Sequence, residues 1–322
     1  MTGDLLATDT LDLENLTVRG TLQVDGASVV ASCTDCVFHE SPVLPLVVSS
    51  GAHMVLNRVT VTDVVPDGTN AVGLLVSRGG SVDATDLVVD GAYDGVLIHS
   101  GSNAVFDGLT VRNIVRPADV GSAALYVEEG VVTAAHVTID RVRGLGLSVK
   151  NGELTVQDAV VTDIWGGVAP AFLAVDGGVL NLVDVRAEDA TGGAVVAALG
   201  SEIHIQGAEI GDVRGWDGPL EVAQMGLVVL PGGVVTASDV VFSGDQGTAV
   251  IVQGGRLFLE GAEFGPSTGS GVFAVEGGSV LLRDLVMVGR TGVGVAAVDA
   301  AVVVEGGSVT DTQRPEMVKL GA

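Results

Sequence analysis

The chain has 322 residues, of which 47% are apolar and only 3% aromatic, and its net charge at pH 7 is −25. Such an acidic surface disfavours binding to nucleic acid or to anionic lipid, which carry charge of the same sign. No apolar run approaches the roughly 18 residues that a membrane-spanning helix needs, so membrane insertion is not expected.

A phrase of about 22 residues recurs along almost the whole chain. It reads GLLVSRGGSVDATDLVV from Gly73, GLSVKNGELTVQDAVV from Gly146 and GLVVLPGGVVTASDVVF from Gly226. Within each copy, three short segments alternate apolar and polar residues, as strands with one buried face do. A fixed period of this length is typical of solenoids, in which each coil buries its apolar residues against its neighbours.

The sequence therefore predicts an all-β fold, a single right-handed parallel β-helix of about 11 to 12 coils, with about 22 residues per coil and three parallel sheets. The right hand follows from the general preference of crossovers between parallel strands. We expect N-terminal coils and a possible cap within residues 1–45, parallel β-helix repeats over 46–311 and a C-terminal tail over 312–322. Neither end shows an amphipathic helix, so end-to-end self-association or continuation into a longer chain is expected there.

Cys33 and Cys36 form a C-x-x-C sequence in an early coil. Alignment with later coils puts both at inward positions, Cys33 in the column of Ala84 and Cys36 in that of Leu87. Two interpretations stay open: small buried core residues, which we favour, or a disulfide, which would imply an oxidising compartment. No second pair or nearby histidine cluster completes a zinc site.

Two corners of the coil are recognisable in the sequence. Glycine pairs such as Gly79-Gly80 and Gly277-Gly278 separate the first strand from the second and suit a tight turn with positive φ. A second corner carries a column made mostly of Asp and Gly, namely Arg58, Asp86, Gly108, His136, Asp158, Asp184, Gly207, Asp239, Gly261 and Asp284. Because Asp and Gly tolerate bends, we interpret this column as structural rather than catalytic or calcium-binding.

The third corner varies in length from coil to coil, and the extra residues follow the third strand, where Pro66, Pro170 and Pro266 lie. Inserts at one corner of a solenoid project as a row of loops, and such rows are commonly binding faces. We therefore expect ligand-binding residues in these loops: Arg112, Asn113, Arg116, Asp163, Trp165, Arg214, Trp216, Asp217 and Glu221. Exposed Trp beside Arg and carboxylates suits stacking on a sugar ring, although each Trp could equally fold back over the apolar core.

The repeat phrase, from about Leu46 to Asp311, resembles right-handed parallel β-helix proteins of the pectate-lyase-like superfamily, in particular the Gly/Val/Asp-rich repeat proteins of bacterial surfaces. The resemblance implies an extracellular or cell-surface location, although no secretion signal is visible after Met1. Enzymes of the superfamily usually carry clustered carboxylates with Arg or Lys, and its galacturonan hydrolases add N-T-D and G-H-G segments. This sequence contains neither segment, which favours a non-enzymatic role.

The leading functional hypothesis is a non-catalytic domain that displays its edge loops for adhesion or carbohydrate recognition. The alternative is a lyase or glycoside hydrolase acting on an acidic polysaccharide, with Asp163, Arg186, Arg214 and Asp217 as catalytic residues. There, a carboxylate would abstract a proton beside a uronate carboxyl group and an arginine would neutralise the resulting charge. A structural spacer is the second alternative. No cofactor is expected, although calcium between Asp212 and Asp217 stays open without a D-x-D-x-D-G loop to support it.

Overall fold

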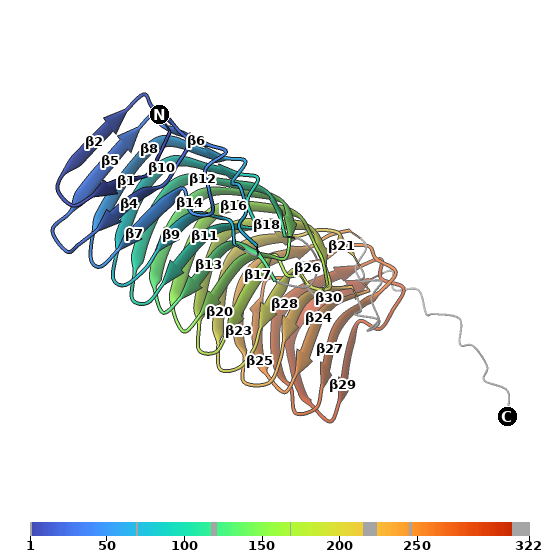
Figure 1. The fold of residues 1–322 in the computed structure, drawn as a ribbon. Helices are drawn as coiled ribbons and strands as arrows, with labels where there is room; N and C mark the ends of the chain where they lie inside the picture. The colour runs from blue at the N-terminus through green and yellow to red at the C-terminus, as the bar shows by residue number, and fades with distance from the viewer. Residues whose placement is uncertain are drawn as a thin grey trace.

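The computed structural model describes residues 2–68, 70–116, 121–167, 169–214, 224–244 and 247–310. Over these residues the chain is all β and winds into a parallel β-solenoid of about 12 turns, with about 23 residues per turn. The described residues contain no helix, and so none that could cross a membrane. The strands β1 (Leu5–Ala7) and β2 (Leu11–Glu14) lie at one end of the stack, while β29 (Val295–Val298) and β30 (Ala301–Thr310) lie at the other (Figure 1). The predicted solenoid is confirmed.

The strands form two hydrogen-bonded parallel sheets that run the length of the stack. The first sheet contains β1, β4 (Leu22–Asp25), β7 (Leu46–Ser49), β9 (Val72–Val76), β11 (Asp94–His99), β13 (Ala123–Glu128), β15 (Leu145–Lys150), β17 (Phe172–Val175), β19 (Val195–Ala197), β22 (Met225–Val229), β24 (Thr248–Gln253), β27 (Ser270–Val275) and β29. The second, which we call the bent sheet, contains β2, β3 (Thr17–Val18), β5 (Val30–Thr34), β6 (Val37–His39), β8 (His53–Thr62), β10 (Ser81–Asp90), β12 (Asn103–Val115), β14 (Val131–Arg143), β16 (Glu153–Trp165), β18 (Val179–Thr191), β20 (Glu202–Ile210), β21 (Val213–Arg214), β23 (Val234–Phe242), β25 (Arg256–Glu260), β26 (Glu263–Phe264), β28 (Ser279–Val288) and β30.

The bent sheet supplies two of the three predicted faces of the coil. In β10 the backbone turns at Asp86, whose φ is 53°, and the ladder to β12 continues on both sides of that residue. The whole Asp/Gly column behaves alike, with φ between 49° and 80° at every position from Arg58 to Asp284. Long strands of the bent sheet such as β10 and β12 therefore have two arms joined at a left-handed residue, as the structural interpretation of the column predicts.

The core is filled by inward side chains of Val, Leu, Ala and Phe, and the coils approach each other closely where the phrase begins with glycine. A side chain at Gly95 would collide with the carbonyl oxygen of Ala124 on the next coil, and one at Gly146 would collide with that of Ala171. The recurring glycine therefore allows neighbouring backbones to approach at this position of the coil.

Cys33 and Cys36 are both fully buried, as their inward positions in the sequence alignment predict. A disulfide joins them across the corner at Asp35, whose φ is 55°. Of the two interpretations that the sequence left open, the structure has the bridged pair rather than two separate thiols.

Candidate functional site

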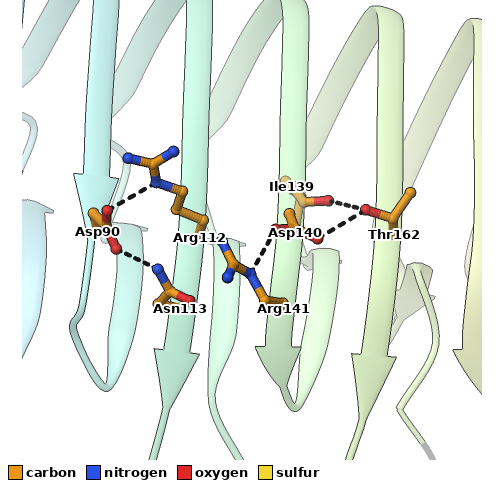
Figure 2. Close-up of polar contacts among 7 residues, drawn as sticks. All are labelled: Asp90, Arg112, Asn113, Ile139, Asp140, Arg141 and Thr162. Atoms are coloured by element: carbon orange, nitrogen blue, oxygen red, sulfur yellow. Dashed lines mark hydrogen bonds and ion pairs between the residues drawn. The ribbon is translucent and has the colours of Figure 1, made fainter.

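The edge that follows the second arm of the bent sheet carries polar side chains in register from coil to coil (Figure 2). Asp90 on β10 accepts hydrogen bonds from Arg112 Nε at 2.8 Å and from Asn113 Nδ2 at 2.6 Å. Two coils further on, Asp140 accepts one from Arg141 Nε at 2.7 Å. Two predicted binding residues, Arg112 and Asn113, are thus engaged by a carboxylate of the preceding coil, in cross-strand pairs of the kind that stabilise a sheet.

Arg214 joins carboxylates from two earlier coils at the same edge. Its Nη2 lies 3.0 Å from Asp189 Oδ1, and its Nη1 lies 3.5 Å from Asp163 Oδ1. The three side chains are between 38% and 54% exposed, so water screens their attraction, and pairs of this kind contribute about 0–1 kcal/mol each. The structure therefore brings together Asp163 and Arg214, two of the four residues of the enzymatic alternative.

The other two residues of that alternative are not joined to this group. Arg186 contacts Glu188 and lies 3.7 Å from Glu209, and the hydrogen bond to Glu188 raises the pKa of its guanidinium. Asp217 lies outside the described residues. Arg186 is therefore paired with Glu188 and Glu209 and not with the Asp163–Arg214 group.

Trp165 is the last residue of β16, lies opposite Arg143 of β14 in register, and is partly exposed. Trp216 and Glu221, with Asp217 of the calcium alternative, fall outside the described residues. In the part of the chain that the structure describes, no group of three or more His, Cys, Asp or Glu residues could hold a metal ion.

Arg116 differs from the other edge arginines because its side chain is only 13% exposed. Its Nη1 donates a hydrogen bond to the Gly121 carbonyl at 3.1 Å and lies 3.8 Å from Asp94 Oδ2. Asp94 Oδ1 accepts the Ala123 backbone N–H at 3.1 Å. This pair opens into a pocket of about 270 Å³ on the outer face of the first sheet, which we call the Asp94 pocket. The pocket is also lined by Leu97, His99, Ser122, Tyr126 and Leu145.

Two rings on neighbouring strands line the Asp94 pocket. His99 of β11 and Tyr126 of β13 meet edge to face, with centroids 5.7 Å apart and planes inclined by 62°. His99 Nδ1 lies 3.3 Å from Glu128 Oε2, and Glu128 Oε1 lies 3.0 Å from Lys150 Nζ on the next coil. This chain of contacts over three coils restrains the imidazole ring against which Tyr126 packs.

Burial and hydrogen bonding shift the pKa values of three side chains in and beside the pocket. Burial raises the pKa of the Asp94 carboxyl group, against the opposing effects of the Ala123 N–H and of Arg116. Burial also raises the pKa of the Tyr126 phenol, while the hydrogen bond from Lys150 lowers the pKa of Glu128. Tyr126 therefore presents a neutral hydroxyl group at physiological pH, able both to donate and to accept a hydrogen bond.

Of the residues that line this pocket, the sequence interpretation named only Arg116. A signal for Asp94 was present, because it occupies a strand position that is apolar in the neighbouring coils, where Val72, Ala123 and Leu145 stand. A carboxylate in an otherwise apolar column marks an exceptional position. Tyr126 gave a weaker signal, as one of only two tyrosines in the chain.

No family model and no curated protein matches this chain. Among solved structures, it is similar to DFA-IIIase from Arthrobacter chlorophenolicus A6 in complex with DFA-III, at 12% identity and a TM-score of 0.43, over 86% of this chain and 76% of that one. A second structure of DFA-IIIase from the same organism, in complex with GF2, shows 12% identity and a TM-score of 0.40, over 90% of this chain and 86% of that one. Similarity at this level concerns the fold alone.

Proposed function

We propose that this chain is a non-catalytic carbohydrate-recognition domain of the extracellular or cell-surface type, built on a coil like that of pectate-lyase-like β-helix proteins. Its binding site is the Asp94 pocket, and its role is adhesion to or recognition of a glycan. The observation that carries this proposal is that a buried Asp94–Arg116 pair and the His99–Tyr126 rings line one open pocket.

The chemistry of the pocket matches the two sides of a sugar unit. A pyranose ring has apolar C–H faces, which pack on an aromatic side chain, and hydroxyl groups at its rim, which need hydrogen-bond partners. Tyr126 offers both a ring and a hydroxyl, while the largely buried Asp94 and Arg116 side chains offer an acceptor and donors. A site built around buried polar groups discriminates strongly against ligands that leave those groups unpaired.

A non-catalytic role is favoured by the number of carboxylates in the pocket. Glycoside hydrolysis generally uses two carboxyl groups that flank the bond to be broken. Among the described residues that line the pocket, Asp94 is the one carboxylate. Glu128, on the neighbouring strand, is held between His99 and Lys150.

One observation favours a second candidate function, a lyase acting on an acidic polysaccharide. The pKa of Asp94 is raised by burial, as in many catalytic bases, and Arg116 lies beside it to neutralise a uronate carboxyl group. In this alternative the Asp94–Arg116 pair would replace Asp163, Arg186, Arg214 and Asp217 as the catalytic group. Cleavage of a polysaccharide would distinguish the lyase from the non-catalytic recognition domain.

The test measures retention and cleavage together on a panel of immobilised neutral and acidic polysaccharides, with and without calcium. We expect retention without new chain ends, and a loss of about tenfold in affinity, or 1.4 kcal/mol, for Tyr126→Ala and for Asp94→Asn. Phe273→Ala is the matched control, because Phe273 is an outward aromatic residue on β27 of the same sheet. It should bind as the wild-type protein does.

New unsaturated ends on a uronate polymer would establish the lyase instead. Retention that is unchanged in both pocket variants would place the site elsewhere. Failure to retain any glycan would leave the structural spacer as the surviving function.

A further inference from the structure

A second hollow lies on a different face of the coil, on the first arm of the bent sheet. It has a volume of about 250 Å³ and is lined from four successive strands, β18, β20, β23 and β25. One row of outward side chains crosses it in register, namely Asn181, His204, Thr236 and Phe258. A parallel row contains Val183, Gln206 and Ser238. We call it the Thr236 hollow.

The hollow arises because small side chains on one strand stand between larger ones on its neighbours. Thr236 and Ser238 of β23 form the floor, His204 and Gln206 of β20 form one wall, and Phe258 of β25 forms the other. Strands in a sheet lie about 4.8 Å apart, so the flanking strands β20 and β25 are separated by roughly 10 Å. This width suits one ring that stands between the walls with a face toward Phe258.

Among the described residues, the Phe258 ring has one cation–π partner, Arg283. The Arg283 guanidinium lies 5.3 Å from the centre of the Phe258 ring, and it comes from β28, the strand on the far side from β23. Arg283 is itself held by Glu305, with Nε 2.7 Å from Oε2. The cation therefore polarises and restrains the ring from outside the hollow, and the β23 side of Phe258 remains available for packing.

The hollow also carries uncharged hydrogen-bonding side chains. Gln206 and Asn181 carry amides, and Thr236 and Ser238 carry hydroxyls. The side chains of Gln206, Thr236 and Ser238 form no hydrogen bond with another described residue. The titratable side chain in the lining is His204, whose Nε2 lies 3.6 Å from the Glu202 carboxylate. The hollow thus offers an aromatic ring, amides and hydroxyls, and no basic group free of a carboxylate that could attract an anion.

We propose that the Thr236 hollow is a second glycan site, which binds an uncharged sugar unit with one ring face on Phe258 and its hydroxyls on Gln206, Thr236 and Ser238. The net charge of −25 and the neighbouring Glu202 disfavour an anionic sugar by repulsion. Amides and hydroxyls, which both donate and accept, match the hydroxyl groups of a neutral hexose. This site does not depend on the Asp94 pocket, which lies on the other sheet and has its own lining residues.

The test is titration of the ¹⁵N-labelled protein with linear oligomers of glucose, mannose, galactose and xylose, and with oligogalacturonate as the anionic comparison. We expect a neutral oligomer to shift the amide signals of residues 204–206 and 236–238, and oligogalacturonate to leave them in place. Thr236→Phe, which fills the hollow, and Phe258→Ala, which removes its wall, should each weaken binding about tenfold or more.

Thr133→Phe is the matched control, because Thr133 occupies the same outward column on β14, away from the hollow. It should leave the titration unchanged, and its melting temperature shows whether an added ring in this column disturbs the fold. Tyr126→Ala separates this proposal from the proposed function: it should weaken binding at the Asp94 pocket about tenfold and leave the shifts at 204–206 and 236–238 intact. Failure of every neutral oligomer to move those signals, or equal binding by Thr236→Phe, would overturn the second site and leave the first untouched.

Discussion

The guanidinium of Arg290 lies 5.6 Å from the centre of the Phe264 ring, and Phe264 stacks on Phe242 of the preceding coil with centroids 4.8 Å apart. Arg290 is fully buried and donates one hydrogen bond, from Nη1 to the Ser270 carbonyl at 2.9 Å. Its Nε and Nη2 atoms have no partner among the described residues. Burial lowers the pKa of this guanidinium to about 10, so it remains charged at neutral pH inside the stack.

This buried charge leads to a stability prediction. Arg290→Met should leave the free energy of unfolding unchanged or raise it by about 1–4 kcal/mol, because an apolar side chain of similar volume avoids the desolvation of an unpaired cation. Arg290→Ala should lower it, because the packing over Phe264 is lost as well. Urea unfolding of the three proteins measures both effects. A strong loss of stability in Arg290→Met would show that the guanidinium has an essential anionic partner.

The glycine at the start of the repeat phrase should not tolerate a methyl group. A Cβ at Gly95 would strike the Ala124 carbonyl and the Val111 side chain, so the coils would have to separate. We expect Gly95→Ala to lower the free energy of unfolding by about 1–3 kcal/mol, the usual cost of overpacking a core. Gly121→Ala is the control, because no atom lies within 4 Å of the added methyl group. Equal melting temperatures for the two variants would contradict the steric argument.

The Asp/Gly column predicts a ranking of substitutions at one corner. Asp184 has a φ of 52° and an exposed side chain. Asp184→Gly should be nearly neutral, whereas Asp184→Val should cost about 1–2 kcal/mol, because a β-branched residue fits the left-handed region poorly. Thermal unfolding of both variants checks the order. If valine proved as stable as glycine, the conformation of this corner would not be what selects Asp and Gly.

Stability should depend on pH through Asp94. Because burial raises the pKa of this carboxyl group above its ordinary 3.8, the folded state keeps the proton to a higher pH than the unfolded state does. The free energy of unfolding therefore falls as pH rises from about 3.8 through the raised pKa, where the charge of Asp94 appears beside Arg116 and His99. The stability of Asp94→Asn relative to the wild-type protein should grow over that window and then level off. Urea titrations at a series of pH values measure the difference, and a flat difference would contradict the prediction.

Much of the fold could be predicted because the strand pattern, the corner residues and the repeat length of the phrase all indicate the same parallel β-solenoid. Alternation around Leu74 and Val82 indicates strands, the Gly79-Gly80 pair marks one corner, and Asp86 marks the next. The sequence could not show that the ladder runs unbroken past Asp86, since a single left-handed residue bends a strand without ending it. The disulfide was not predicted either: the sequence favoured two unbridged core cysteines, because an inward Cys packs in either redox state, and the structure has the bridge.

The candidate site was harder to predict, because most of the residues that line the Asp94 pocket are not the variable-corner residues that the sequence singles out. Arg112 and Asn113 are polar residues at a variable corner, yet both bind Asp90 of the coil before. Asp94 and Tyr126 lie on regular strands and become a site only through the register of adjacent coils. Which side chains lie next to each other is determined by the register between strands of adjacent coils. The repeat phrase alone does not show which neighbouring side chains leave a pocket between them.

Because each coil stacks directly on the next, the distance along the solenoid axis between two sites changes only in steps of one strand spacing. The coil between the two proposed sites begins at Glu153, which is in register with Val179 of the following coil. Excision of residues 153–178 would join equivalent positions, keep every lining residue of the Asp94 pocket and the Thr236 hollow, and shorten the axial separation of the sites by one strand spacing, about 4.8 Å. The axial distance between the two proposed sites is therefore set by the number of coils between them.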